Sequence, residues 1–551
     1  MTPRKAFENG NARAGVILEM SRALRRIIGF VGVVACVCAP ALGQTLHRGN
    51  GAEPGTLDPA KSETLGEGHI QGDLFEGLVI LDRDGGVQPG QAAYWTVSPD
   101  GLHYRFTLRA GLRWSNGDPL TAMDFVYSLR RVVDPKVGSS YAYLLAPIAN
   151  ADAIIDGAIK DPAALGVSAP DPRTLDVTLA APTPFFLTLL AHSKFLPVHR
   201  ESVERWGQSF TRPGHLVSNG AFMLKDWVPQ ARIVLERNPY YRDAGHVALK
   251  RVVYLPIEDG GTELRMYRAG QVDITADVPA ALLDVVRRDF PQELATAPAL
   301  SASYLGYNLT RPPFRAAGGL RLALALVIDR EAICDRILKS SARPAYGWVP
   351  PGLPGYSRQR VSWADWPMAR RITLARQLYA AAGYGPSHRL RLELRFNTND
   401  TNKRLAIAIA SMWHETLGVE TDLLNEEFKV FLENRKARKV TQVYRGGWTA
   451  DYADPSTFTD LLGSKAGLND TGYDNPDYDA LIARAAADAD PVGRMADLAA
   501  AERLLLSDLP LIPLYDGMWL HLVKGYVQGY RPNVLGYAYS KDIRLRPDRA
   551  P

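Results

Sequence analysis

Cysteine is scarce in this sequence, with three residues among 551. Cys36 and Cys38 lie in an N-terminal segment that we expect to be removed, so Cys334 would be the one thiol of the mature chain unless Cys36 carries a lipid. An internal disulfide then cannot form, and stability has to come from large cores. Because Cys334 lies in the helical run Arg330 to Leu338, we expect a buried structural thiol there.

Motifs of the common enzyme classes are also missing. The ten histidines include no pair spaced three or four residues apart, as in a zinc-binding helix. There is no glycine-rich phosphate loop ending in Lys-Ser/Thr and no Gly-x-Ser-x-Gly turn. Catalytic residues can come together from distant positions, so only the motif-bearing classes are excluded. We expect no tight metal site and no cofactor.

Positive charge is not in excess once the N-terminus is set aside. The formal net charge is +5, from 64 basic and 59 acidic residues. Residues 1–43 contain six basic and two acidic residues, which leaves only +1 on the rest of the chain. Binding a phosphate backbone needs a concentrated basic surface. The composition therefore argues against a nucleic-acid partner.

The N-terminal segment, residues 1–43, has the pattern of a secretory signal peptide. Three arginines between residues 22 and 26 precede an uncharged apolar stretch from Ile27 to Ala39, and small residues follow. Those 13 residues would span only about 20 Å as a helix, short of the roughly 30 Å hydrocarbon core. We therefore expect cleavage before Gln44 and a periplasmic protein, in preference to a retained anchor.

Two details of this segment stay open in the sequence. Met20 is a candidate for the true start, because the arginines follow it directly. Val33, Val34 and Ala35 precede Cys36 much as in a lipid-attachment site. A periplasmic lipoprotein is therefore an alternative to a freely soluble periplasmic protein.

Length and composition indicate an ordinary globular protein of several regions. A chain of 551 residues is too long for one hydrophobic core, and 46% hydrophobic with 22% charged residues is typical of soluble proteins. Turn-rich apolar segments alternate with helical ones, which predicts an α/β or α+β class with mixed sheets. We find no short repeat, low-complexity tract or heptad pattern.

The clearest local pattern lies between residues 102 and 133. Tyr104 to Leu108 alternates as a strand, and Asn116-Gly117 marks a turn. Thr121 can cap a helix that runs through Leu129, and Asp124 at the third helical position supports that cap.

Three more helices are predicted by their periodicity and by what ends them. They are Thr262 to Ala269, ended by Gly270 and followed by a strand from Val272 to Thr275; Lys403 to Leu417, ended by Gly418 and followed by a strand from Val419 to Leu423; and Arg494 to Leu506, ended before Pro510.

Several stretches resemble a known family. The longest is LRAGLRWSNGDPLTAMDFVYS at residues 108–128, and further matches follow at residues 73–78 (DLFEGL), 218–222 (SNGAF), 267–273 (YRAGQVD) and 445–452 (RGGWTADY). These segments resemble extracytoplasmic solute-binding proteins of peptide and nickel transporters, family 5. The resemblance runs from about Gly49 to the C-terminus. It is nearest to the oligopeptide-binding members, with the murein-peptide-binding ones beside them.

The resemblance implies a fold of two α/β lobes joined by a hinge of two crossing segments, the large three-region form of the type II periplasmic binding protein fold, with mixed sheets flanked by helices. The first lobe would comprise residues 44–75, 197–300 and 516–551. Residues 76–196 would form an additional region packed on that lobe. Residues 301–515 would form the second lobe.

The same resemblance assigns residues to the two ends of a peptide. Asp451 matches the aspartate that receives the α-ammonium, and Trp448 and Tyr452 beside it can form pocket walls. Arg435 and Arg445 match arginines near the peptide's carboxyl end, where a planar guanidinium can bind a carboxylate through two hydrogen bonds. Without the resemblance, each of these charged residues would be more typical of a solvated loop or a surface ion pair.

Other positions match the family less closely. Arg311 replaces a lysine, Asn402 replaces a histidine that helps hold the carboxylate, and Phe428 replaces a tryptophan. Glu63 matches an acidic residue beside the ligand, and Tyr141 and Asn219 match positions in or near the cleft. Ser301 and Thr449 occupy two positions that form a disulfide in the nearest relative, so both cysteines are lost together.

Our hypothesis is a monomeric periplasmic protein that captures short peptides between its lobes and delivers them to the membrane permease subunits of an ABC transporter. A murein peptide, a nickel chelate or a sugar is the alternative within the binding class. An exported peptidase or other hydrolase is the alternative among enzymes. A chaperone or sensory role would use the same peptide affinity.

Overall fold

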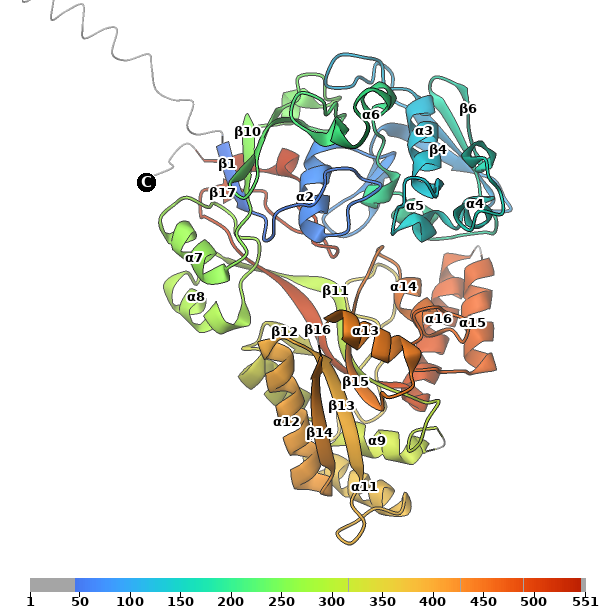
Figure 1. Ribbon diagram of the computed structural model, residues 1–551, viewed down its shortest axis with the longest axis vertical. Helices are drawn as coiled ribbons and strands as arrows, with labels where there is room; N and C mark the ends of the chain where they lie inside the picture. Colours follow the sequence, from blue (N-terminus) through green and yellow to red (C-terminus); the bar gives the residue numbers. More distant parts are fainter. Residues whose placement is uncertain (1–44, 316, 427, 489, 547–551) are drawn as a thin grey trace, which may run out of the picture.

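The computed structural model describes residues 45–546 except 316, 427 and 489, and the side chains of 400, 428 and 429 are also outside it. The predicted signal peptide, Met20, Cys36 and the cleavage point before Gln44 lie outside the described residues. Figure 1 shows two lobes, one above the other, joined by the long strands β11 (Leu294–Tyr307) and β16 (Leu511–Leu522). The predicted two-lobed α/β fold with mixed sheets is confirmed.

The upper lobe contains two four-stranded sheets. The first has the order β1 (Thr45–Gly49), β10 (Arg251–Leu255), β9 (Arg232–Arg237) and β8 (Phe222–Val228), and only β1 and β10 are parallel. The second is antiparallel, with the order β4 (Ala92–Val97), β5 (His103–Leu108), β7 (Thr174–Thr178) and β6 (Val167–Asp171). Two short pairs accompany them: β2 (Val79–Leu81) with β3 (Val87–Pro89), and β17 (Val527–Gln528) with β18 (Arg544–Leu545).

The helices of the upper lobe are mostly short. They are α2 (Leu65–Leu74), α3 (Ala122–Val133), α4 (Ala151–Ile155), α5 (Phe186–Leu189), α6 (Arg200–Trp206), α7 (Gly260–Arg268) and α8 (Leu283–Asp289). In Figure 1, α7 and α8 lie beside the upper part of β11 and β16, at the junction of the lobes.

The lower lobe is built on one six-stranded mixed sheet. Its order is β12 (Ala342–Pro344), β16, β11, β15 (Val443–Thr449), β13 (Arg391–Asn397) and β14 (Glu420–Glu426). β13 is parallel to both of its neighbours, and the other pairs are antiparallel. The helices are α9 (Gly318–Leu326), α10 (Arg330–Ala332), α11 (Met368–Ala381), α12 (Asp400–Leu417), α13 (Phe428–Ala437), α14 (Ser456–Thr459), α15 (Pro476–Ala487) and α16 (Pro491–Asp508).

Separate cores underlie the two lobes. One cluster of buried apolar residues runs from Leu300 to Val534, and another from Leu46 to Tyr254 with Ile274 and Ile543 added. A small third cluster joins α7 and α8 to Leu520 and Leu522 of β16. Cys334 is buried in the lower core at 2% exposure, as predicted. Because each lobe buries its own core, the lobes can change their relative position without unfolding.

Most local sequence predictions are confirmed. The strand and helix expected around Thr121 are β5 and α3, and the Asp124 carboxylate accepts a hydrogen bond from the Thr121 backbone N–H at 2.8 Å. α12 ends at Leu417 because Gly418 adopts a left-handed conformation, with φ of 73°. The strand after it is β14, and α16 starts three residues before the predicted Arg494.

The strand predicted from Val272 to Thr275 was wrong. Only Ile274 forms ladder contacts, as isolated bridges to Arg48 and Val523. The segment fills the space between β1 and the end of β16, where Asp273 accepts the His47 backbone N–H at 2.7 Å. The backbone also bonds to both neighbours, the Gly49 N–H to the Ile274 carbonyl at 2.8 Å and the Thr275 N–H to the Leu522 carbonyl at 3.0 Å, but these contacts do not continue into a ladder.

The region boundaries predicted at 300/301 and 515/516 fall inside β11 and β16. The pairing of these strands is interrupted between Pro298 and Ala302, and Ala302 pairs with Asp516. An irregularity there is a reasonable place for a hinge, because the two strands lack continuous hydrogen bonds. The boundaries themselves stay predictions. Within residues 45–546, no helix is both long and apolar enough to cross a membrane.

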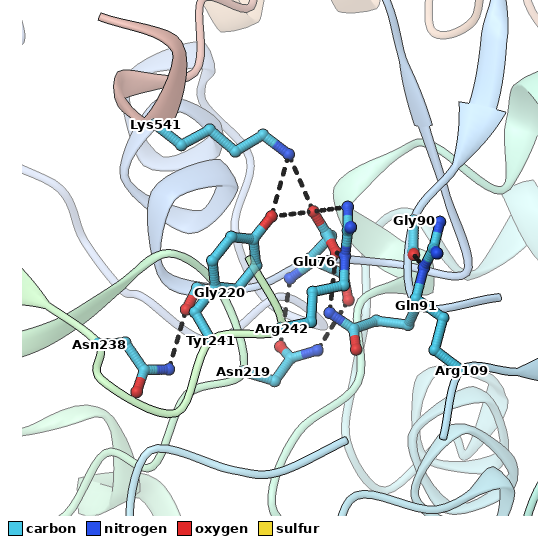
Figure 2. A network of polar contacts seen from close by, with 10 residues as sticks. All are labelled: Glu76, Gly90, Gln91, Arg109, Asn219, Gly220, Asn238, Tyr241, Arg242 and Lys541. Carbon is cyan, nitrogen blue, oxygen red and sulfur yellow. Dashed lines mark hydrogen bonds and ion pairs between the residues drawn. The ribbon is translucent and has the colours of Figure 1, made fainter. Parts of the chain in front are cut away.

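A buried charge cluster around Glu76 joins segments of the upper lobe that are far apart in the sequence (Figure 2). The Glu76 carboxylate, 4% exposed, accepts from Arg242 Nε at 2.5 Å and from Lys541 Nζ at 2.9 Å. Tyr241 and Gln91 also donate to it, at 2.6 and 2.9 Å. Burial alone would raise the pKa of Glu76, but Lys541 and Arg242 lower it to about 2. Residues far apart in sequence therefore meet at one carboxylate.

We predict that Glu76→Gln lowers the free energy of unfolding by about 3–5 kcal/mol, because it leaves two buried cations without their counter-charge. The pKa of Glu76 is lower in the folded state, so its contribution is complete above about pH 4.5 and is lost as the pH falls toward about 2. Urea unfolding of both proteins at several pH values measures this. Glu236→Gln, at a surface pair with Arg251, is the control and should cost under about 1 kcal/mol. Equal losses in the two variants would contradict the prediction.

Ser301 and Thr449 can accept an engineered disulfide. They lie directly opposite each other on β11 and β15, with hydroxyl oxygens 3.4 Å apart. Facing positions on antiparallel strands have Cα separations within the range of natural disulfides. We expect Ser301→Cys with Thr449→Cys to close a bridge under oxidising conditions and to stabilise the protein by about 2–4 kcal/mol. Thiol titration and unfolding with and without reductant measure this, with the single variants as controls. With Cys334 counted, a closed bridge leaves one free thiol, and three free thiols after oxidation would show that the strands are paired differently.

Candidate ligand-binding cleft

A pocket of about 350 Å³ lies between the two lobes. The upper side contributes Glu63, Tyr141 and Lys194, and the lower side contributes Asp451. Asp451 reaches the pocket because β15 ends at Thr449 and the chain turns there toward the upper lobe. Three residues predicted from the sequence, Glu63, Tyr141 and Asp451, are thus brought together.

Asp451 is a carboxylate without a cationic partner. Among the described residues, no Lys, Arg or His side chain forms an ion pair with it. Its Oδ2 accepts a hydrogen bond from the Tyr143 hydroxyl at 3.2 Å, and its backbone N–H lies 3.5 Å from the Thr457 hydroxyl. Loss of water contact raises the pKa of Asp451 to about 6. An ionised carboxylate in such surroundings is stabilised by a cation that enters the pocket.

The aromatic residues beside Asp451 have different roles from each other. Trp448 lies on β15 and packs against the lower core, with its indole N–H 3.4 Å from the Thr457 hydroxyl. Tyr452 stacks on Phe185 of the upper lobe, with ring centroids 4.7 Å apart and planes 6° from parallel. Tyr452 is therefore a contact between the lobes, and Trp448 supports the strand that leads to Asp451.

Glu63 and Tyr141 face Asp451 from the upper lobe. The Glu63 carboxylate accepts a hydrogen bond from the Ser140 hydroxyl. The Tyr141 ring lies 5.1 Å from Lys194 Nζ. Burial, and then the charges of Asp451 and Glu63, raise the pKa of Tyr141. The upper wall of the pocket therefore presents an aromatic face and one acidic group.

Lys194 is a pocket residue that sequence reasoning missed. It is 2% exposed, and its Nζ donates to the Pro59 carbonyl at 2.8 Å and the Ser62 hydroxyl at 2.9 Å. Burial lowers its pKa to about 8. These bonds fix the turn that carries Glu63. The available signal was a single lysine in the otherwise uncharged and mostly apolar run from Phe185 to Val198.

The two predicted arginines lie in different surroundings. Arg435 forms an ion pair with Asp470, Nε to Oδ2 at 2.5 Å, so its charge is already neutralised within the lower lobe. Arg445 lies on β15 opposite Leu305 of β11, and its buried Nε has no hydrogen-bond partner in the described part of the chain. Neither arginine lines the Asp451 pocket, and of the two only Arg445 has no ion-pair partner in the described part of the chain.

Asn402 and Arg311 are not lining residues of the Asp451 pocket. Asn402 lies in the first turn of α12, where its Nδ2 donates to Asn397 Oδ1 at 3.0 Å. Arg311 is exposed and donates to the Lys439 carbonyl, beyond the end of β11 that pairs Tyr307 with Val443. Asp451 follows the opposite end of that strand pair. The structure therefore does not bring Arg311 and Asp451 together.

Asn219 and Phe428 complete the predicted set. Asn219 is 2% exposed, donates to the Glu76 carbonyl at 2.8 Å and accepts the Glu76 N–H at 3.2 Å, as Figure 2 shows. It fixes the backbone of the buried charge cluster and faces no open space there. Phe428 begins α13, but its side chain lies outside the described residues.

One cluster of metal-ligating residue types occurs in the described chain, at Asp118, His199 and Glu201. His199 Nδ1 accepts the Ser202 backbone N–H at 3.3 Å, which requires the ring proton to be on Nε2. That Nε2 faces Asp118 Oδ2 at 3.2 Å. His199 caps the N-terminus of α6 through the hydrogen bond from Ser202, so the arrangement fits a helix-capping hydrogen-bond network.

Comparison with known proteins places the chain in a family. The sequence model of the family "Bacterial extracellular solute-binding proteins, family 5 Middle" matches residues 86–470. The periplasmic oligopeptide-binding protein OppA of Escherichia coli is 39% identical over 491 residues, covering 88% of this chain and 90% of OppA. The probable deoxycholate-binding periplasmic protein YgiS of the same organism is 40% identical, covering 91% of this chain and 94% of YgiS.

Solved structures agree with this grouping. The unliganded open form of MppA, a periplasmic murein tripeptide-binding protein, superposes with a TM-score of 0.83. It is 37% identical, and the match covers 93% of this chain and 99% of MppA. The strand, turn and helix motif at residues 108–128 thus predicted the family correctly. The chain belongs to the family 5 bacterial extracellular solute-binding proteins.

Proposed function

We propose that this protein binds short peptides with a free amino terminus between its two lobes and delivers them to the permease subunits of an ABC transporter. The observation that carries this proposal is the Asp451 carboxylate, half-buried in the interlobe pocket without a cationic partner in the described chain. The ammonium group of a peptide would supply the missing positive charge. Closure of the lobes around it strengthens the attraction, since an ion pair at 4 Å is worth about 1 kcal/mol in water and about 4 at an effective dielectric of 20.

Arg445 is the group that we assign to the other end of the peptide. Its guanidinium has an unpartnered buried Nε, which can donate to a carboxylate. Arg445 and Thr449 are four residues apart on β15, about 13 Å along a strand. An extended peptide of about four residues spans that distance. Because Arg435 is paired with Asp470, its role at the ligand, like the roles of Arg311, Asn402 and Phe428, rests on the family resemblance alone.

Pocket chemistry also separates the ligand classes. A murein peptide has a free ammonium and fits Asp451 as an ordinary peptide does. Deoxycholate, the ligand after which YgiS is named, is an anion, and Asp451 and Glu63 would repel it. A sugar would leave Asp451 without a counter-charge. We therefore favour a peptide over these solutes and over a nickel chelate.

Localisation and assembly follow from the same grouping. OppA and YgiS are named as periplasmic proteins, and the apolar segment after Arg26 is typical of an exported chain. We infer a periplasmic monomer, freely soluble or lipid-anchored at Cys36. Family 5 proteins are transport components, so we propose binding without catalysis; peptide cleavage by pure protein would point to a hydrolase.

The direct test is a substitution of the carboxylate. Asp451→Asn keeps the shape and removes the charge, so we expect at least a thirtyfold loss of affinity, about 2 kcal/mol, for tetrapeptides with a free amino terminus. N-acetylated peptides should lose far less. Titration calorimetry measures both, and Asp422→Asn, at an exposed pair with Arg391, is the control. Equal losses for both peptide types would remove the proposed role of Asp451.

Binding should also depend on pH. Asp451 has a pKa of about 6, and only its ionised form attracts an ammonium, so affinity should fall as the pH drops through about 6. The peptide amine titrates near pH 8 and loses its charge above that value. We therefore expect the tightest binding between about pH 6.5 and 8, measured by calorimetry in buffers of one ionic strength. Affinity that is constant from pH 5 to 8 would exclude Asp451 as the charged partner.

A further inference from the structure

Tyr143 connects the two lobes at the proposed ligand site. It lies in the short helical turn Ala142–Leu145 of the upper lobe. Its hydroxyl donates to Asp451 Oδ2 at 3.2 Å, across 308 residues of sequence. The family motifs identified in the sequence do not include it. The one direct hydrogen-bond donor to the Asp451 carboxylate in the described chain therefore comes from the opposite lobe.

The Tyr143 ring is placed by its neighbour. It stacks on Tyr141, with ring centroids 5.8 Å apart and planes at 28°. The residue as a whole remains 48% exposed. The stacking fixes the ring plane and with it the direction of the hydroxyl.

A second contact next to it joins the same two segments. Phe185 of the upper lobe stacks on Tyr452, and Arg494 lies 5.5 Å from the Phe185 ring. Arg494 in turn pairs with Asp454 at 2.6 Å. The segment 451–454 is therefore held from the upper lobe at two points, and Asp451 keeps its position relative to Tyr143.

The two carboxylate oxygens of Asp451 have different surroundings. Oδ2 is occupied by the Tyr143 hydroxyl, whereas Oδ1 has no hydrogen-bond partner in the described part of the chain. An incoming ammonium can bind Oδ1 without displacing Tyr143. A carboxylate that already accepts one hydrogen bond is also stabilised in its charged form.

We propose that Tyr143 is a specificity-determining residue of the ligand site: its hydroxyl stays on Asp451 Oδ2 in the complex and directs a primary ammonium to Oδ1. This inference rests on the proposed function. Tyr143 would thereby favour ligands with a free amino terminus and support closure, because the same hydrogen bond joins the lobes.

The charge environment fits this role. The groups that face Asp451 are the acid Glu63, the cation Lys194, His192 and the phenols Tyr141 and Tyr537. Burial lowers the pKa of His192 to about 3, so His192 is uncharged at neutral pH; Lys194 is held by Pro59 and Ser62 and forms no ion pair with Asp451 in the described chain. Burial raises the pKa of Asp451, and the Tyr143 hydrogen bond opposes that effect. Removing the hydroxyl should therefore raise the pKa of Asp451 above about 6.

Tyr143→Phe removes the hydroxyl and keeps the stacked ring. We expect a tetrapeptide with a free amino terminus to bind roughly three- to tenfold more weakly at pH 7.5. Binding of its N-acetylated form should not change, and the acid midpoint of binding should move to higher pH. Calorimetry over a pH series measures these quantities. Tyr94→Phe, at a 59% exposed residue on β4, is the matched control and should bind as the wild type does.

A ligand-free readout separates this inference from the proposed function. In protein labelled at the aspartate carboxyl carbons, the signal missing from Asp451→Asn identifies Asp451, and it should titrate at higher pH in Tyr143→Phe. If the wild type binds no peptide, the proposed function fails, yet this titration still decides whether Tyr143 acts on Asp451. An unchanged titration overturns the inference. Unchanged or tighter peptide binding by Tyr143→Phe overturns its role in ligand selection.

Discussion

The structure depends on one unbalanced charge: the Asp451 carboxylate, placed between two lobes and left without a cation from the described chain. Burying a charge in this way is unfavourable, and the raised pKa of Asp451, about 6, reflects that cost. A protein that keeps such a group gains stability when a ligand neutralises it. Binding and closure are therefore favoured by the same interaction, because closure removes the water that screens it.

The remainder of the molecule keeps that carboxylate in position. β11 and β16 join the lobes, and the interruption near Ala302 gives them a place to bend. In the upper lobe, the Glu76 cluster joins distant segments, and Lys194 fixes the turn that carries Glu63. Most charged groups in these supports are already paired within their own lobe. The site thus has firmly held walls, and its Asp451 carboxylate has no cationic partner in the described chain.

Sequence reasoning predicted the fold well where local patterns decide it. Thr121 with Asp124 and Leu417 with Gly418 mark helix ends by local hydrogen bonding and backbone geometry, so both were correct. It failed at Val272 to Thr275, where only Ile274 pairs, through isolated bridges to two distant segments. The family resemblance assigned Asp451, Glu63 and Tyr141 separately to the ligand site, and all three line one interlobe pocket.

The sequence could not show which distant residues form ion pairs or hydrogen bonds with the predicted site residues. The sequence around Arg435 does not indicate that Asp470 neutralises its charge. The sequence around Tyr143 does not indicate that its hydroxyl reaches Asp451. Such pairings depend on how the lobes and loops pack, and no local periodicity encodes them.

The most direct measurement is a crystal structure of the protein with a bound tetrapeptide that has a free amino terminus. We expect closed lobes, with the peptide ammonium nitrogen about 3 Å from a carboxylate oxygen of Asp451. A peptide carboxylate or an apolar group at Asp451, or a peptide bound outside the interlobe pocket, would contradict it.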